Sequence, residues 1–240
     1  MLLALDTSAA VSVAVCDGRD VLVERSVHDP RRHAELLMPM VEEALRSAGV
    51  QRGDLTMIAV GRGPGPFTGL RVGLVCARTL ALALGVPVHG VTSLDALALQ
   101  VHDCGAVRPG QSFVVASDAR RREVYWRRYV VAAHQSGDLP VRPSSDPQVC
   151  RPAELALAGD RCFGRGVVLY PDLLGPAPQS PLDPGAGAVA RTAVAELARR
   201  DPGSTATTEP LYLRRPDVSE PTFGKSVLGS NVAATQERRR

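Results

Sequence analysis

The chain has 240 residues, is 45% hydrophobic and carries a formal net charge of +3. These totals favour one or two globular domains with a sizeable core, and they exclude a chain that is disordered as a whole. Lys225 is the only lysine, so the abundance of arginine points to composition before it points to nucleic-acid binding. The five cysteines are scattered, with no Cys-x-x-Cys pair, which predicts a reducing cytoplasm and no zinc framework.

The N-terminal residues predict an antiparallel start. The first hydrophobic run ends at Asp6 and lacks the basic start of a signal peptide, so we interpret it as a strand. Asp17 and Gly18 form a strong hairpin signal between two further apolar runs. We therefore expect strands at residues 2–5, 12–15 and 21–25.

A helix is expected next, over residues 31–48. Asp29 supplies an N-cap, Pro30 suits the first helical position, and Gly49 closes the helix. Pro39 lies inside this helix and should bend it.

Residues 61–73 read Gly-Arg-Gly-Pro-Gly-Pro-Phe-Thr-Gly-Leu-Arg-Val-Gly, directly after a predicted buried strand at 55–60. Gly63 and Gly65 allow backbone angles closed to other residues, Thr68 is a good N-cap, and the helix that starts near Gly69 offers a partial positive charge. The segment is therefore a candidate phosphate or nucleotide loop. An equally supported alternative is that the glycines only make a tight turn and a close helix packing.

The helix expected over residues 69–84 is apolar nearly all round. Such a helix either lies inside a core or covers a second surface together with a partner. For a chain of this size we favour the partner and keep the internal helix as the alternative. We expect no membrane role, because the stretch contains Arg71 and Arg78 and is shorter than the roughly 20 residues of a span.

The rest of the chain predicts a second unit. A strand at 86–89 and a helix at 93–102 precede a break at 104–111, after which strands at 113–117 and 124–131 should form a hairpin around residues 118–123. A further strand is expected at 164–170 and a helix within 184–200 that starts near Gly187. We therefore divide the chain into residues 1–103, 104–219 and a loose tail, 220–240.

Several familiar motifs are excluded. Gly224-Lys225-Ser226 lacks the earlier glycine of a Walker A loop, since position 219 is serine, and the Rossmann pattern fails at Thr68. The histidines form no metal spacing, and no Gly-x-Ser-x-Gly nucleophile turn is present.

Five blocks in order carry a resemblance to a known family. They are Leu-Ala-Leu-Asp-Thr-Ser at 3–8, the glycine segment at 63–73, Val-Thr-Ser-Leu-Asp-Ala-Leu-Ala at 91–98, Asp-Ala-Arg-Arg-Arg-Glu-Val-Tyr at 118–125, and Glu-Pro-Leu-Tyr-Leu-Arg at 209–214. Together they resemble the bacterial TsaB (YeaZ) family of the actin, Hsp70 and sugar kinase superfamily. The resemblance implies a two-lobed α/β, ribonuclease H-like fold with a reduced second lobe. Asp6 and Thr7, which end the first strand, are candidate phosphate-binding residues together with the glycine loop.

The resemblance also implies a function. It implies a cytoplasmic, non-catalytic subunit that binds and activates TsaD, with the ATPase TsaE, for formation of N6-threonylcarbamoyladenosine at position 37 of tRNAs reading ANN codons. The subunit requires no cofactor of its own, and the sequence leaves open whether ATP or ADP binds at a site formed in the complex. Helices 31–48 and 69–84 would pair with TsaD, or with a second copy when TsaD is absent, with contact positions at Leu36, Met40, Leu74 and Arg78.

TsaD itself is the rival identification, because it shares the glycine segment and performs the transfer. TsaD carries a His-x-x-x-His metal pair. When its Pro-Val-His run is aligned on residues 87–89, those two positions fall on Gly90 and Leu94, and neither side chain can bind a metal.

Two other functional classes stay open. A nucleotide-dependent kinase or acyl transferase would hold phosphates with Asp6, Thr7 and the glycine loop, and it would need Asp118 as its base. A tRNA-binding module would use the arginines at 120–122, 127–128 and 238–240, alone or alongside the accessory role.

Overall fold

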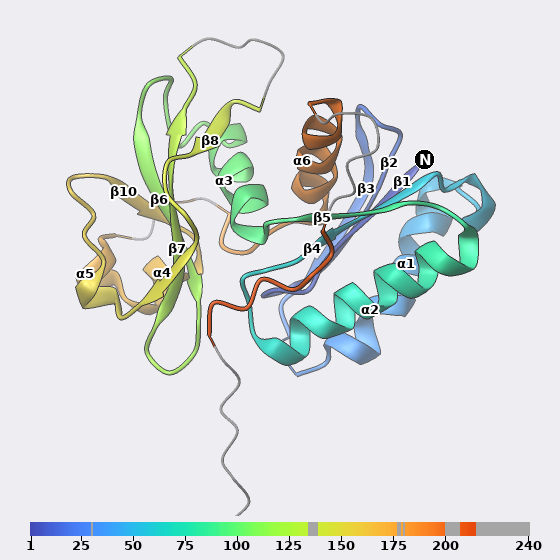
Figure 1. Ribbon diagram of the computed structural model, residues 1–240, viewed down its shortest axis with the longest axis horizontal. Helices are drawn as coiled ribbons and strands as arrows, with labels where there is room; N and C mark the ends of the chain where they lie inside the picture. The colour runs from blue at the N-terminus through green and yellow to red at the C-terminus, as the bar shows by residue number, and fades with distance from the viewer. Residues whose placement is uncertain (30, 134–138, 177–178, 180, 200–206, 215–240) are drawn as a thin grey trace, which may run out of the picture.

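The structure is a computed structural model that describes residues 1–29, 31–133, 139–176, 179, 181–199 and 207–214. Over these residues the chain forms two sheets of five strands, one in each of two lobes (Figure 1). The tail from residue 220, with its three terminal arginines, lies outside the described residues.

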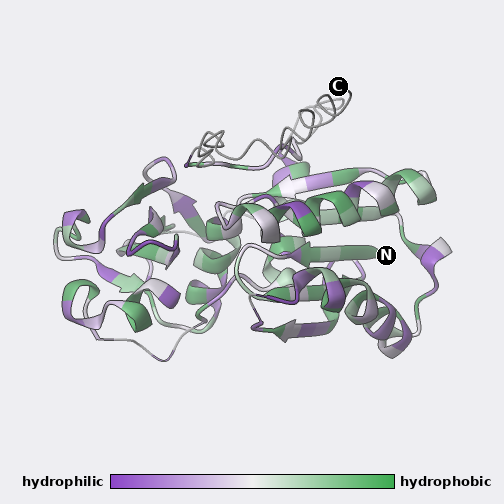
Figure 2. Ribbon diagram, turned by 90° about the horizontal axis from the view of Figure 1, so that it is seen from below, coloured by the Kyte–Doolittle hydropathy of each residue, from purple (hydrophilic) through white to green (hydrophobic). Residues whose placement is uncertain are grey.

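The first sheet has the order β3-β2-β1-β4-β5. The predicted hairpins are confirmed, since β1 (Leu2–Asp6) pairs antiparallel with β2 (Val11–Cys16), which pairs antiparallel with β3 (Val21–Val27). On its other side β1 pairs parallel with β4 (Met57–Gly61), which pairs parallel with β5 (Val88–Val91). The central strand β1 is buried along its whole length and is uniformly hydrophobic up to Asp6 (Figure 2).

Helices cover both faces of this sheet. Helices α1 (His33–Ala48) and α2 (Phe67–Leu84) pack on the face that carries Leu3, Leu5 and Val13. The opposite face, with Leu2 and Ala4, is covered by α6 (Ala186–Ala198), and α3 (Ser93–Asp103) lies beside α6.

The second sheet has the order β10-β6-β7-β8, with β9 also paired to β7. Its strands are β6 (Ser112–Asp118), β7 (Val124–Val131), β8 (Val141–Pro143), β9 (Gln148–Cys150) and β10 (Arg161–Phe163). Helix α3 packs on one face, and α4 (Arg165–Leu169) with α5 (Pro171–Leu174) lies on the other. Single helical turns, η1 (Arg52–Asp54) and η2 (Pro152–Glu154), complete the elements.

Three local predictions were wrong. Helix α1 begins at His33 after Arg32, and the Asp29 carboxylate accepts the backbone N–H of Arg31 in the preceding turn; Pro30 lies outside the described residues. Helix α2 begins at Phe67 after Pro66, so Thr68 sits inside the helix and caps nothing. The strand expected at 164–170 is helix α4, because the turn at Gly164, with φ of 95°, ends β10 and starts a helix.

Helix α6 follows the second sheet in the chain but packs on β1, β2 and β4 of the first. One apolar core, containing Leu2, Leu97, Phe113 and Val189, therefore runs through both lobes. The division of the chain at residue 103 stays a proposal. Helix α6 lies in the predicted second unit by sequence but is assigned to the first lobe by its packing.

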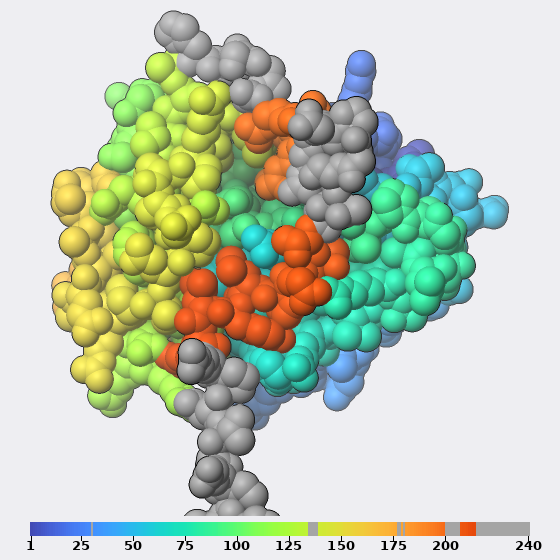
Figure 3. Space-filling view, in the orientation of Figure 1, coloured from blue at the N-terminus to red at the C-terminus, as the bar shows by residue number. Residues whose placement is uncertain are grey.

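The described C-terminal residues, 207–214, form an extended segment that we call the strap. It lies across the front of the molecule between the second lobe and α2 (Figure 3). The backbone N–H of Leu211 donates to the carbonyl of Arg62 at 2.8 Å, and Arg78 of α2 donates to the Thr208 carbonyl at 2.7 Å.

Candidate functional site

A cavity of about 410 Å³ opens between the two lobes. Thr7, Thr68 and Gly69 of the predicted phosphate loop line it from the first lobe, and Asp118 lines it from the second. Asp6, Gly63 and Gly65 are not among its lining residues. The fold therefore brings together half of the predicted loop residues and the predicted second-lobe carboxylate.

Asp6 is fully buried behind this cavity. One carboxylate oxygen accepts the backbone N–H and the hydroxyl of Ser8, at 2.8 and 2.6 Å. The other accepts the Ser93 hydroxyl at 2.7 Å, and Ser93 Oγ in turn accepts the N–H of Gly63 at 3.1 Å. Burial raises the pKa of Asp6 to about 6, against the lowering effect of these hydrogen bonds. Asp6 thus ties β1, the glycine loop and α3 together.

The glycines of the loop pack directly on the turn after β1. The Thr7 hydroxyl donates to the Gly69 carbonyl at 2.8 Å and accepts the N–H of Gly73 at 3.1 Å. A Cβ on Gly69 would stand 2.6 Å from the Thr7 carbonyl, and one on Gly65 would stand 2.8 Å from the Ser8 carbonyl. At these positions close packing requires glycine. This supports the alternative stated from the sequence, in which the glycines make a tight turn and a close helix packing.

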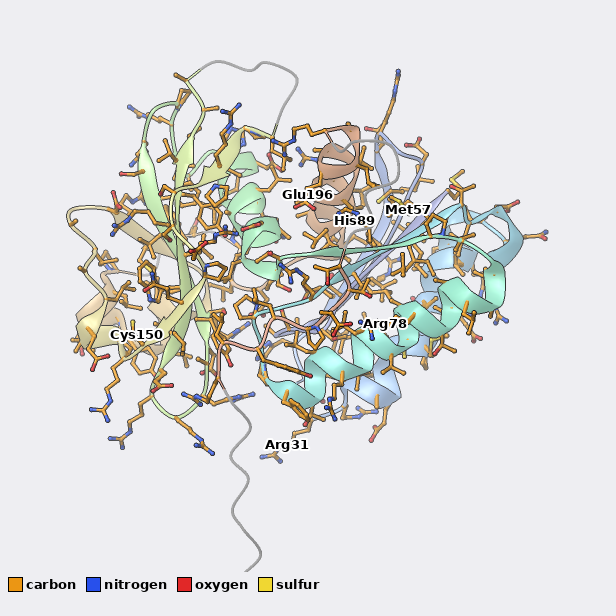
Figure 4. The ribbon with its side chains drawn as sticks, in the orientation of Figure 1. Arg31, Met57, Arg78, His89, Cys150 and Glu196 are labelled. Atoms are coloured by element: carbon orange, nitrogen blue, oxygen red, sulfur yellow. The ribbon has the colours of Figure 1, made fainter. Side chains whose placement is uncertain are left out.

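The charged groups of the cavity come from segments far apart in the chain. Arg165 and His28 both contact Asp183, and His28 lies 3.1 Å from that carboxylate. The Asp118 carboxylate accepts the backbone N–H of Arg120 at 2.7 Å. Arg31, which lies at the lower end of the molecule in Figure 4, and His33 complete the lining. Basic groups outnumber carboxylates here, so the cavity suits an anion. Spacing along the sequence could not reveal this group, since tertiary folding assembles it.

The contact positions predicted on α1 and α2 need correction. Met40 is 7% exposed and Leu74 is 3% exposed, and both belong to the core between these helices and the sheet. Leu36 is half-buried, and Arg78 is engaged with the strap. The outward side of α2 instead presents Val75, 60% exposed, and Leu82, 85% exposed.

Helix α2 is long and apolar enough to span a membrane by length and composition, but a core helix of a soluble protein meets the same criterion. Its inner side packs on β1 and β4. Across the described ranges, no group of three or more His, Cys, Asp and Glu side chains could hold a metal ion. Gly90 and Leu94 offer no ligand atom, so these residues do not fit the metal site of TsaD.

Comparison with known proteins gives three results. The family model described as "TsaD: tRNA N6-adenosine threonylcarbamoyltransferase" matches residues 26–163. The tRNA threonylcarbamoyladenosine biosynthesis protein TsaB of Haemophilus influenzae is 34% identical over 178 residues, 70% of this chain and 73% of that protein. An uncharacterized protein of Mycobacterium bovis is 40% identical over 219 residues, 90% of this chain and 92% of that protein.

Among solved structures, YeaZ from Pseudomonas aeruginosa is 34% identical, with a TM-score of 0.72 over 88% of this chain and 99% of that one. A second Pseudomonas aeruginosa structure, described as similar to peptidase YeaZ, has a TM-score of 0.73 over 89% of this chain and 99% of that one. The two-lobed α/β fold expected from the sequence is confirmed.

Proposed function

Because this chain belongs to the TsaB (YeaZ) family, we propose that it serves in the synthesis of N6-threonylcarbamoyladenosine in tRNA, as an accessory subunit that binds and activates TsaD. The relatives named for this pathway support the first part. The outward side of α2 is the observation that carries the second.

That side of α2 is an exposed apolar stripe. Val75 and Leu82 are seven residues apart, which is two helical turns, so both point the same way. Thr79 is exposed between them in the chain, and Thr68 is exposed before Val75. Isolated exposed apolar residues are common, but an aligned pair on the most apolar helix of the chain suits a protein partner. We define the pairing stripe as Thr68, Val75, Thr79 and Leu82.

The proposed role is non-catalytic. The residue types that TsaD uses for metal binding are absent at Gly90 and Leu94, and Asp6 is committed to three internal hydrogen bonds. TsaE and tRNA would join through the complex with TsaD, in the cytoplasm. A second copy of the chain would occupy the same stripe when TsaD is missing, because similar partners compete for one surface.

Size-exclusion chromatography with light scattering on an equimolar mixture with TsaD of the same organism tests the proposal. An equimolar complex is expected for the wild type. Leu82→Glu should weaken it at least about tenfold, because a charge would be buried at the interface. Leu173→Glu is the matched control, since Leu173 is also exposed and lies on α5 in the other lobe.

Two results would contradict the proposal in different ways. If the wild-type chain forms no complex with TsaD even when TsaE and ATP are added, the accessory role is wrong. If Leu82→Glu keeps its melting temperature and pairs as tightly as Leu173→Glu, the role stands but the stripe is wrong.

A second candidate is a nucleotide-dependent enzyme. The cavity that joins Thr7, Thr68 and Gly69 to Asp118 favours it, because this is where the phosphates of a nucleotide would meet both lobes. Calorimetry with ATP and an assay of its hydrolysis by the isolated chain test this candidate. Turnover that Asp118→Ala abolishes would support it, and absence of binding at millimolar ATP would remove it.

A further inference from the structure

The turn between β6 and β7 holds three arginines in an uncommon backbone conformation. Arg120, Arg121 and Arg122 have φ values of 61°, 53° and 62°, in the left-handed region that favours glycine. Each such residue with a long side chain costs free energy, and runs of them persist only where the surroundings fix them. All three side chains are exposed. The turn therefore holds three arginine side chains at the surface at a cost in stability, and the Arg120 guanidinium there pairs with the Asp118 carboxylate at 3.3 Å.

Specific contacts hold this turn in place. The Asp118 carboxylate accepts the backbone N–H of Arg120 at 2.7 Å, and the N–H of Ala119 donates to the Glu123 carbonyl at 3.0 Å. From the strap, Arg214 pairs with the Glu123 carboxylate and donates to the Ala119 carbonyl at 3.4 Å. The strap thus braces the base of the arginine turn and leaves its tip outward.

Two residues before Arg214, the strap forms an aromatic stack with α2. The rings of Tyr212 and Phe67 are stacked with centroids 5.1 Å apart, and the Arg71 guanidinium lies 3.7 Å from the Phe67 centroid. Arg71 Nε also donates to the Tyr212 hydroxyl at 3.3 Å. Both rings are more than a third exposed, at 36% and 38%. A two-residue step spans about 7 Å, so the strap carries the stack and the brace of the turn close together along the chain.

The arginines of β7 are less exposed than those of the turn. Arg127 binds Asp95 at 2.8 Å, and Arg128 binds Asp160 at 2.7 Å, so both are engaged inside the second lobe. Of the arginines that the sequence offered for tRNA, those at 127–128 are structural, and those at 120–122 remain at the surface. The terminal group at 238–240 lies outside the described residues.

We propose that the arginine turn and the aromatic stack form one surface that binds a single-stranded RNA loop. The guanidinium groups would neutralise phosphates, and the exposed rings would stack on unpaired bases, which is how proteins hold single strands. The proposal rests on the proposed function only for the choice of RNA, which is the anticodon loop of a tRNA. It needs no contact with TsaD.

Fluorescence anisotropy with a labelled, unmodified tRNA anticodon stem-loop tests the surface on the full chain. Arg121→Ala/Arg122→Ala should lower affinity about tenfold or more and reduce the slope of log affinity against log salt by about 1.5, as two lost phosphate contacts require. Arg46→Ala/Arg52→Ala is the matched control and should behave as wild type, since Arg46 lies in the last turn of α1 and Arg52 begins η1 just after that helix.

The aromatic part has its own variants. Tyr212→Ala should lower affinity about tenfold with an unchanged salt slope, and Tyr212→Phe, which keeps the ring, should bind as wild type. A fully paired RNA of the same length should compete at least about tenfold less well than the stem-loop.

Each contrary result overturns a stated part. Equal affinity and slope for the two double variants, or no stem-loop binding by the chain alone, overturns the RNA surface. Unchanged binding by Tyr212→Ala, or equal competition by paired RNA, overturns stacking on unpaired bases. These readouts use the isolated chain, so they stand whether or not TsaD pairs with the α2 stripe.

Discussion

The two sides of α2 differ in what they contact. The inner side, with Gly69, Gly73 and Leu74, is closed against the turn after β1 and the sheet beneath it. The outer side, with Val75 and Leu82, is exposed among the described residues. An apolar helix can therefore pack in a core on one side and leave large apolar residues exposed on the other, so substitutions at neighbouring positions test different things.

Gly73→Ala should have the largest effect on this contrast. Alanine normally favours a helix, but its Cβ would overlap the buried Thr7 hydroxyl, which already bonds Gly69 and Gly73. We expect a loss of about 4 kcal/mol in the free energy of unfolding, measured by urea denaturation. Gly53→Ala, with no atom near its added Cβ, is the control and should change little. Equal stability of the two variants would contradict the close packing.

Leu74→Ala and Leu82→Ala compare the two sides directly. The first empties a core position and should cost about 3 kcal/mol in unfolding free energy, while the second should cost less than about 0.5 kcal/mol. Urea denaturation of both proteins measures the difference. Similar losses in the two variants would mean that the outer side is not a free surface.

The buried carboxyl of Asp6, at the end of β1, should make the stability of the folded chain depend on pH. Its pKa is about 6 in the folded chain and near 3.8 when unfolded, so the folded state binds more protons between these values. Its contribution to stability is therefore complete below about pH 4 and falls by on the order of 2 to 3 kcal/mol as pH rises through 6.

Unfolding free energies of wild type and Asp6→Asn, measured from pH 4 to 7.5, isolate this group from the others that titrate there. The variant should lose the part of the pH slope that Asp6 causes. Parallel curves would show that the buried carboxyl does not titrate in this range.

Arg78→Ala should have the smallest effect. Arg78 is exposed on α2 and holds the strap through Thr208 and a solvent-exposed ion pair with Glu209. Its loss should cost less than about 1 kcal/mol in global stability. Hydrogen exchange at the Leu211 amide, which bonds Arg62, should nevertheless become faster, and unchanged exchange would argue against this anchoring.

The sequence predicted most of the first sheet, because alternation and the Asp17-Gly18 turn are local signals. It misplaced Leu74 because a helix that is apolar all round has no periodicity to mark its buried side. Val167 and its apolar neighbours resembled a strand, and only the turn at Gly164 makes them helical.

The sequence predicted only part of the cavity lining. Thr7, Thr68 and Gly69 belong to recognisable segments, whereas His28, Arg31 and Arg165 reach the cavity only through the packing of two lobes. No single stretch of sequence encodes that meeting. The aromatic stack was missed for the same reason, since Phe67 and Tyr212 are far apart in the chain.

Helix α6 sets the order in which this protein can be completed during synthesis. Five strands of the first sheet are made by residue 91, but the helix that covers their second face ends at residue 198. A ribosome adding about 5 to 20 residues per second leaves that apolar face open for several seconds. A nascent chain stalled before α6 should therefore be a target for chaperones, although its second sheet is already finished.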